Sequence, residues 1–280
     1  MSNLNIIPLK DWGFNFERPV IISGPCSCET EEQMMETAQR LADKGIHVLR
    51  AGIWKPRTRP GMFEGIGKEG LKWLVDAGKQ IGKPTTVEVA TAQHVEESLE
   101  AGVDILWIGA RTTVNPFSVQ EIADALRGVD IPVLVKNPIN PDLQLWLGSM
   151  ERLNAVGIKR LGAIHRGFSS YEKSKYRNKP MWELPIELRR QYPEMPIIVD
   201  PSHICGSREL IPSVCQKALD LDFDGLMIES HRDPDNAWSD ASQQITPERL
   251  GELISSLVVR SSKLDDYAEN KLEALRAQID

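Results

Sequence analysis

The chain has 280 residues, with 33 lysines and arginines against 40 aspartates and glutamates, which gives a formal net charge of −7. This acidic balance argues against a general nucleic-acid-binding protein, because such proteins usually carry a strong basic excess. The 41% of hydrophobic residues exclude a disordered chain, and the four cysteines are too few for a disulfide scaffold. No apolar run approaches the ~20 residues of a membrane helix and no signal sequence opens the chain, so we expect a cytoplasmic globular protein.

Eight short, largely apolar runs follow one another along the sequence, each bounded by polar residues, glycine or proline. They are VIIS from Val20, HVLR from His47, TTVEV from Thr85, ILWI from Ile105, VLVK from Val133, RLGAI from Arg160, IIVD from Ile197 and GLMIE from Gly225. Such runs are typical of parallel strands buried on both faces, and their starts lie 20 to 38 residues apart, which leaves room for a helix after each one. Eight such units predict an α/β fold, a closed (β/α)8 TIM barrel over residues 19–260. A doubly wound open sheet would show the same alternation, but the count of eight favours the barrel.

Amphipathic stretches fill the intervals between the predicted strands. Thr30 and Gln33 form a capping-box pair that predicts a helix start, and Thr246 before a proline predicts the start of the last helix. Residues 1–18 precede the first strand, and we expect this extension to cover the floor of the barrel. Residues 261–280 follow the last helix as a linker and the beginning of one further amphipathic helix.

Cationic side chains follow most of the predicted strands. Because the strands of a barrel all end on one face, residues far apart in the sequence meet there. The cations at these positions are Arg50, Lys55, Arg57, Arg111, Lys136 and Arg166. So many positive charges repel one another unless anions compensate them, and guanidinium groups fit phosphate and carboxylate oxygens. The pattern predicts one or two small polyanionic ligands, and the alternative is that these side chains form ordinary surface ion pairs.

A second group at the same face combines a thiol, an imidazole and two carboxylates. Its members are Cys26, His203, Glu229 and, in the loop after the last strand, Asp240. This mixed donor set suits Mn²⁺, Fe²⁺, Co²⁺ or Zn²⁺ better than Mg²⁺. No local motif such as C-x-x-C ties the four together, so a core cysteine and a hydrogen-bonded histidine are the alternatives. With the cations, the group favours a metal that polarises a carbonyl near bound phosphate, and both carbon–carbon bond formation and phosphoryl chemistry stay open.

Six motifs carry a resemblance to one enzyme family. They are GPCSCE at 24–29, KPRT at 55–58, IGAR at 108–111, HRG at 165–167, DPSH at 200–203 and SDASQQ at 239–244. In order over about residues 19–260, they resemble the type I 3-deoxy-D-arabino-heptulosonate-7-phosphate (DAHP) synthases, in particular the short bacterial β subgroup. The resemblance implies the first step of the shikimate pathway of aromatic amino acid biosynthesis. In that step phosphoenolpyruvate condenses with erythrose 4-phosphate, and phosphate is released.

The resemblance also implies a role for each matching residue. One divalent metal, with Mn²⁺ expected first and Fe²⁺, Co²⁺ or Zn²⁺ as the other candidates, would be bound by Cys26, His203, Glu229 and Asp240. The phosphoenolpyruvate carboxylate would be held by Arg50 and Lys136, its phosphate by Arg111 and Arg166, and the aldose phosphate by Arg57 and Thr58. Glu88, Ala110 and His203 complete the expected substrate-binding set. Lys55 is expected beside the reacting carbons as a catalytic proton donor whose pKa the neighbouring cations depress, with Cys26 and His203 as further catalytic residues.

Two other functions are weighed against this one. The 3-deoxy-D-manno-octulosonate-8-phosphate synthases are similar throughout but typically have a longer, asparagine-containing stretch after the lysine. Here Pro56, Arg57 and Thr58 favour the four-carbon aldose. A non-catalytic barrel that regulates a fused mutase would have lost a metal ligand or a phosphate-binding arginine, and none of these residues is missing from the sequence.

The C-terminal residues resemble a different protein. LEALRAQID at 272–280 is similar to the opening of the first helix of the all-helical chorismate mutases. This implies a synthase fused to a chorismate mutase domain and cut shortly after the linker, and a mere amphipathic tail is the alternative. Residues 1–18 are too few for the ferredoxin-like regulatory domain of some relatives. Barrels of this family usually associate, so we expect a homo-oligomer, with neither nucleic acid nor membrane as a partner.

Overall fold

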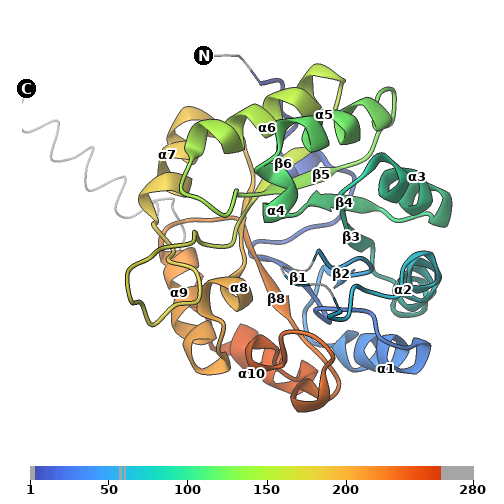
Figure 1. Cartoon of the computed structure of the whole chain (residues 1–280). Coiled ribbons are helices and arrows are strands. Elements are labelled where there is room, and N and C mark those ends of the chain that lie inside the picture. Colours follow the sequence, from blue (N-terminus) through green and yellow to red (C-terminus); the bar gives the residue numbers. More distant parts are fainter. Residues whose placement is uncertain (1–3, 57–58, 60, 260–280) are drawn as a thin grey trace, which may run out of the picture.

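The computed structural model describes residues 4–56, 59 and 61–259, and its strands form a ring inside a circle of helices (Figure 1). The strands are β1 (Val20–Gly24), β2 (Val48–Ala51), β3 (Thr85–Val89), β4 (Ile105–Ile108), β5 (Val133–Lys136), β6 (Leu161–His165), β7 (Ile197–Val199) and β8 (Gly225–Glu229). Each strand pairs in parallel with the next, and β8 pairs with β1, so the sheet closes. The predicted TIM barrel is confirmed, and each strand begins within one residue of its predicted run.

Eight longer helices surround the barrel. They are α1 (Glu31–Leu41), α2 (Lys68–Ile81), α3 (Ala92–Ala101), α5 (Pro116–Ala125), α6 (Leu143–Ala155), α7 (Glu183–Gln191), α9 (Ile211–Asp220) and α10 (Pro247–Ser256) among the described residues. The Thr30 side chain accepts a hydrogen bond from the Gln33 amide, and Thr246 accepts one from the Arg249 amide, so both predicted helix starts are confirmed.

Short helical turns lie in the loops, mostly near the strand ends. They are α4 (Ala110–Thr113) after β4, α8 (Pro201–Cys205) after β7, and the 3₁₀ turns η1 (Leu9–Asp11), η2 (Arg208–Leu210), η3 (Pro234–Asn236) and η4 (Ala241–Gln243). None of the helices in the described part of the chain is long and apolar enough to span a bilayer. The cytoplasmic location stays a prediction. The linker and mutase-like segment expected at 261–280 lie outside the described residues.

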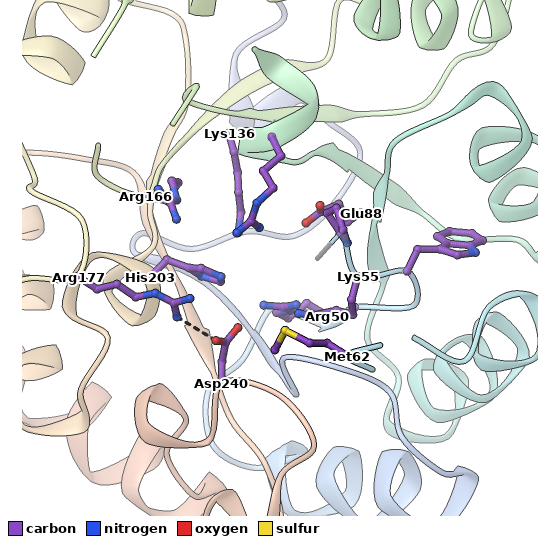
Figure 2. Close-up of a pocket in the computed structure, with 13 residues that line it drawn as sticks. Arg50, Lys55, Met62, Glu88, Lys136, Arg166, Arg177, His203 and Asp240 are labelled. Carbon is purple, nitrogen blue, oxygen red and sulfur yellow. Dashed lines mark hydrogen bonds and ion pairs between the residues drawn. The ribbon is translucent and has the colours of Figure 1, made fainter. Parts of the chain in front are cut away.

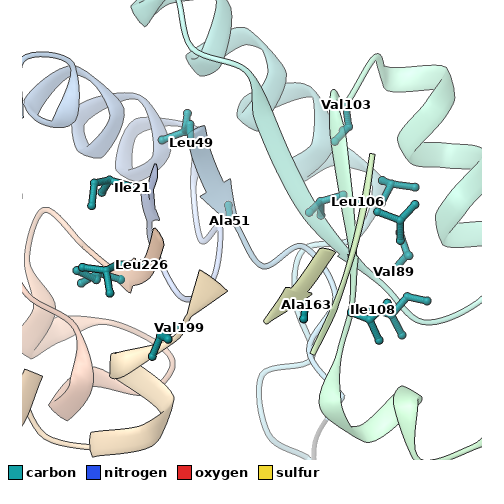
Figure 3. Close-up of a cluster of buried hydrophobic side chains, with 14 of the residues drawn as sticks. Ile21, Leu49, Ala51, Val89, Val103, Leu106, Ile108, Ala163, Val199 and Leu226 are labelled. Atoms are coloured by element: carbon teal, nitrogen blue, oxygen red, sulfur yellow. The ribbon is translucent and has the colours of Figure 1, made fainter. Parts of the chain in front are cut away.

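The main hydrophobic core fills the space between the sheet and the helices (Figure 3). Outward-facing strand residues such as Leu49, Leu106 and Leu226 are fully buried there against the helices. Because side chains alternate along a strand, the residues next to these point into the barrel. The sequence runs look continuously apolar because both faces of every strand are covered.

The interior of the barrel is divided along its axis. Val48, Leu134 and Met227 belong to an apolar cluster in its lower part. Two residues further along the same strands, Arg50, Lys136 and Glu229 are buried polar side chains. The period of two therefore places an apolar layer below and a charged layer above, at the ends where barrel active sites lie.

The N-terminal extension packs against the apolar layer at the lower end. Trp12 is only 2% exposed within that cluster, and Phe14 and Phe16 pack against it. The Trp12 indole donates a hydrogen bond to the Ile7 carbonyl at 2.9 Å, and Arg160 donates one to the Trp12 carbonyl at 2.8 Å. The described part of the extension thus covers the lower end of the barrel, away from the charged layer.

Candidate functional site

A pocket opens at the carboxyl ends of the strands, and cationic side chains converge on it (Figure 2). Its lining includes Arg50, Lys55, Arg111, Lys136 and Arg166, together with Glu88, His203 and Asp240. The structure thus brings together five of the six predicted cations. Arg57, the sixth, and Thr58 lie outside the described residues. Ala110 is buried at the start of α4, next to Arg111 in the sequence, and is not among the residues that line the pocket.

The strand ends place each of these side chains. Arg50 lies on β2, Glu88 on β3, Lys136 at the end of β5 and Arg166 directly after β6. Gly24 at the end of β1 is required for this arrangement. Its φ is +148°, and a Cβ there would lie 2.0 Å from the Arg50 carbonyl oxygen. Any side chain at this position would push β1 and β2 apart.

Two buried ion pairs form the base of the pocket. Arg50 donates to Glu229 at 2.8 Å, and Lys136 donates to Asp200 at 2.9 Å. All four side chains are at most 5% exposed, so these are not the surface ion pairs of the alternative interpretation. Charges this deep must be paired, since breaking such a pair leaves an uncompensated buried charge. The pairs therefore fix two cations at the base of the pocket.

Trp107 of β4 lies beneath these two cations. The Arg50 guanidinium is 5.0 Å from the centre of the indole ring, and the Lys136 ammonium is 5.8 Å from it, both within cation–π range. The indole nitrogen donates a hydrogen bond to Glu88 at 2.9 Å, which turns that carboxylate toward the pocket. One aromatic side chain thus supports both cations and orients an acid.

Lys55 lies against the cysteine of the second predicted group. Its ammonium donates to the Cys26 sulfur at 2.8 Å and to the Cys26 carbonyl at 3.1 Å. Burial lowers the pKa of Lys55, but Cys26 and Glu229 raise it by more, so its pKa lies above the ordinary value. The expectation that neighbouring cations depress this pKa is wrong, because the anionic groups around Lys55 outweigh Arg50.

The thiol, the imidazole and the two carboxylates also converge. The Cys26 sulfur lies 3.3 Å from an Asp240 oxygen, and His203 Nε2 lies 3.9 Å from Glu229 Oε1. No three of these donors are already grouped as a metal site in the described chain. Instead the thiol and both carboxylates each have a cation beside them: Lys55 at Cys26, Arg50 at Glu229, and Arg177 at Asp240, 2.9 Å away.

Asp200 orients the histidine of this group. One carboxylate oxygen accepts a hydrogen bond from the His203 amide at 3.0 Å and caps α8, and the other lies 2.9 Å from His203 Nδ1. Nε2 is thereby left facing Glu229. A carboxylate behind the imidazole is the arrangement usual for metal-binding histidines, because it fixes the ring and its tautomer. His203 and Lys136 hold the pKa of Asp200 well below its ordinary value, despite its burial.

Arg166 is poised for an anion. Burial, helped by the nearby Arg177 and Arg111 and opposed by Asp200, lowers its pKa to about 10. Its guanidinium donates to the Asn178 side chain at 2.8 Å. A guanidinium whose positive charge is disfavoured by burial and by like charges gains most when an anion binds beside it.

His165, directly before Arg166, is fully buried between aromatic rings. Its ring centre lies 5.7 Å from that of Phe168 and 5.2 Å from that of Trp182. Neither ring nitrogen has a hydrogen-bond partner of good geometry among the described residues. Burial lowers the pKa of His165 to about 3, and the nearby Pro180 carbonyl only partly opposes it. The imidazole is therefore neutral and adds no charge beside the cations.

Comparisons with known proteins place the chain in a family. The sequence profile of the DAHP synthetase I family matches residues 15–264. The chain belongs to the DAHP synthetase I family. It is 33% identical over 237 residues to the phospho-2-dehydro-3-deoxyheptonate aldolase of Thermotoga maritima, which spans 85% of this chain and 68% of the relative. The crystal structure of a DAHP synthase from Thermotoga maritima matches 90% of this chain and 72% of its own, with a TM-score of 0.79 and 30% identity.

More distant relatives represent the alternative activity. The 2-dehydro-3-deoxyphosphooctonate aldolase of Polaromonas naphthalenivorans is 25% identical over 282 residues, which is 91% of this chain and 95% of the relative. The higher identity to the heptonate enzyme favours the DAHP synthase activity predicted from the sequence over the octulosonate alternative. Phosphoenolpyruvate and erythrose 4-phosphate follow as the substrates of the DAHP synthetase I family.

Sequence reasoning missed several residues of this DAHP synthetase I pocket. Arg177 lines it from the loop after β6 and donates to Asp240 and, at 2.7 Å, to Gln243. It follows no strand directly, so the rule of reading strand ends could not find it. Trp107 was read only as part of an apolar strand, although a tryptophan two residues past an inward-facing position is itself inward-facing.

Proposed function

We propose that this pocket condenses phosphoenolpyruvate with erythrose 4-phosphate with the help of one divalent metal ion. The observation that carries the proposal is that His203 and Asp240 line the pocket with the cations and lie against the buried Glu229 and Cys26, so four potential metal donors meet at the strand ends. A polyanionic substrate needs the cations, and an aldehyde that must accept a carbanion-like carbon needs an electrophilic partner.

The cations divide naturally between the ends of phosphoenolpyruvate. Arg166 and Arg111, which both line the pocket, are assigned to its phosphate, because paired guanidinium groups match phosphate oxygens. Arg50 and Lys136 at the base are assigned to its carboxylate. Their own ion pairs and Trp107 hold them rigidly, so little side-chain entropy is lost when the substrate binds.

Apart from the metal, the reaction uses side chains of this pocket and water. C3 of the enol attacks the aldehyde carbon, and the aldehyde oxygen takes a proton. The cationic C2 that results takes up water and releases a proton. The hemiketal then expels inorganic phosphate and leaves the keto product. Lys55 is assigned as the donor of the proton to the new alkoxide, because its pKa is raised and its ammonium is therefore fully protonated at neutral pH.

The residues present fit a first-row divalent metal. Cys26, His203, Glu229 and Asp240 offer one sulfur, one imidazole nitrogen and carboxylate oxygens, and this mixed set suits Mn²⁺, Fe²⁺, Co²⁺ or Zn²⁺. Bound there, the metal would polarise the erythrose 4-phosphate carbonyl. Burial raises the pKa of the Cys26 thiol to about 12. A metal ion bound to the sulfur would lower this pKa again and favour the thiolate. Mn²⁺ stays our first expectation.

Phosphate release with both substrates tests the proposal. We expect turnover with erythrose 4-phosphate, loss of turnover with a chelator, and its return when single divalent ions are added back. Cys26→Ala should abolish the metal-dependent rate. Cys28→Ala is the matched control, because this second buried thiol lies in the core near Gly70, away from the pocket. Full activity after exhaustive chelation would disprove the metal, and faster turnover with arabinose 5-phosphate would disprove the choice of aldose.

The partners beyond the substrates are a separate proposal. We propose that an intact chain continues into a chorismate mutase domain through residues 261–280, and that the barrels form a homo-oligomer. The resemblance of 272–280 to a mutase helix supports the first point. If chorismate and prephenate leave the synthase rate of an intact chain unchanged, a regulatory fusion is excluded.

A further inference from the structure

The loop between β8 and α10 carries Asp240, and the segment after β1 carries Cys26. Buried polar side chains connect these two segments. The Cys26 amide donates to the Gln244 side chain at 2.8 Å, and Gln244 in turn donates to the Ser239 carbonyl at 2.8 Å. The hydroxyls of Ser27 and Ser239 share a hydrogen bond of 2.6 Å. Two hydrogen bonds, from Cys26 to Gln244 and between Ser27 and Ser239, therefore join the segments that carry the two potential metal donors.

Glu29 and His231 complete this connection. One Glu29 oxygen accepts a hydrogen bond from the Trp238 amide at 2.7 Å, and the other lies 3.2 Å from His231 Nε2. His231 Nδ1 accepts a hydrogen bond from the Asp233 amide at 2.9 Å, so its proton resides on Nε2 and is donated to Glu29. Both side chains are at most 5% exposed, where an unpaired polar group is costly.

Asp240 itself has a backbone conformation that requires such support. Its φ of 45° and ψ of 39° lie in the left-handed region, which residues other than glycine adopt infrequently and which asparagine and aspartate tolerate best. Residues in this region persist where the surrounding structure fixes them, and they concentrate at functional sites. Here the hydrogen bonds to Trp238 and Ser239 fix the chain before Asp240, and the bond to Gln244 fixes it after.

We propose that Ser27, Glu29, His231, Ser239 and Gln244 form a loop clamp that positions Asp240 against Cys26 and thereby sets the affinity of the site for its metal. None of the five is assigned to a substrate or to the metal, so they are positioning residues. The inference rests on the proposed metal-dependent function. The inference goes beyond that function because it states that this buried network sets the distance between Cys26 and Asp240, which lie 214 residues apart in the sequence.

Three variants separate the hydrogen bonds of the clamp from its shape. The Gln side-chain amide can replace His231 Nε2 in donating to Glu29, whereas Leu of similar size cannot donate. We therefore expect His231→Leu and Glu29→Ala to weaken Co²⁺ binding by about 10–100-fold, as for other residues that orient metal ligands, and His231→Gln to restore most of it. Binding is followed by the thiolate-to-cobalt absorption band, which reports contact with Cys26.

A second readout needs no metal. In the metal-free protein, amide hydrogen exchange of the peptide covering 236–244 should accelerate in His231→Leu and Glu29→Ala and stay near wild type in His231→Gln. Asp224→Ala is the matched control. It removes a partly buried carboxylate that accepts two hydrogen bonds at the opposite end of β8, so it should lower stability and leave Co²⁺ affinity unchanged.

The outcomes distinguish the clamp from the proposed function. Equal Co²⁺ affinity and exchange in His231→Leu and wild type would overturn the clamp, and so would a His231→Gln variant as defective as His231→Leu. If the wild-type protein gives no Cys26-dependent cobalt band, the metal part of the proposed function is wrong. The exchange of 236–244 then still decides whether the network holds the Asp240 loop.

Discussion

His165 makes a strong prediction about stability and pH. The side chain is completely buried between Phe168 and Trp182, and burial lowers its pKa to about 3, against 6.5 for an exposed histidine. The unfolded chain therefore binds a proton near pH 6.5 that the folded protein refuses until about pH 3. Because the unfolded state binds more protons between pH 6.5 and pH 3, lowering the pH stabilises the unfolded state, and the free energy of unfolding falls.

The size of the effect follows from the two pKa values. Each pH unit between them is worth about 1.4 kcal/mol, so the step from pH 7.5 to pH 5 should remove about 2 kcal/mol through this one residue. His165→Leu has a side chain of similar volume that cannot titrate, and the aromatic neighbours already form an apolar site. We expect this variant to lose about 2 kcal/mol less than wild type over the same step.

Urea unfolding at the two pH values measures the difference. All other titrating groups contribute equally to both proteins, so the comparison isolates His165. His47→Leu is a suitable control, since that imidazole is only half-buried and accepts a hydrogen bond from the Ile21 amide. Equal losses in wild type and His165→Leu would refute the reasoning, as would an imidazole NMR signal of His165 that titrates above pH 5.

Three further predictions concern the pocket and the opposite end of the barrel. Arg166→Gln should weaken phosphoenolpyruvate binding about 10–100-fold, because it removes a charged hydrogen-bond donor. Quenching of tryptophan fluorescence measures this affinity, and an unchanged dissociation constant would exclude a contact between Arg166 and the phosphate. Arg177→Ala should tighten metal binding about two- to fivefold at low salt, because the guanidinium competes with the metal for Asp240. Calorimetry measures this affinity, and weaker binding in the variant would instead make Arg177 a positioning residue. Trp12→Ala should lower the free energy of unfolding by about 3–5 kcal/mol and leave KM unchanged below the new Tm; a raised KM would contradict the separation of floor and pocket.

Much of the fold could be predicted because its signals are local. Each strand appears as a short apolar run, and the barrel follows from their number and spacing. The cations at strand ends could be found in the same way, since parallel strands deliver their last residues to one face. Arg177 could not be found, because hydrogen bonds from Arg177 to Gln243 and from Asn178 to the His203 carbonyl place its loop, rather than a strand.

Charge pairing inside the pocket was the second feature that could not be predicted from the sequence. Counting cations predicted an anion-binding site, but the depressed pKa expected for Lys55 ignored Glu229 and Cys26, which lie far away in the sequence. Spacing along the chain contains no information on which carboxylate faces which ammonium. That information appears only when β1, β2 and β8 are laid side by side.

The division of the barrel interior into an apolar lower layer and a charged upper layer has a consequence for how such a protein can change over evolutionary time. Trp107 belongs to the same buried cluster as Trp12 and carries the cations on its ring, so the apolar layer stabilises the fold from below while the ionic groups lie above it at the mouth. Mutations at the mouth can then change which sugar phosphate binds without unfolding the protein, because the packing that supplies the free energy of folding lies elsewhere.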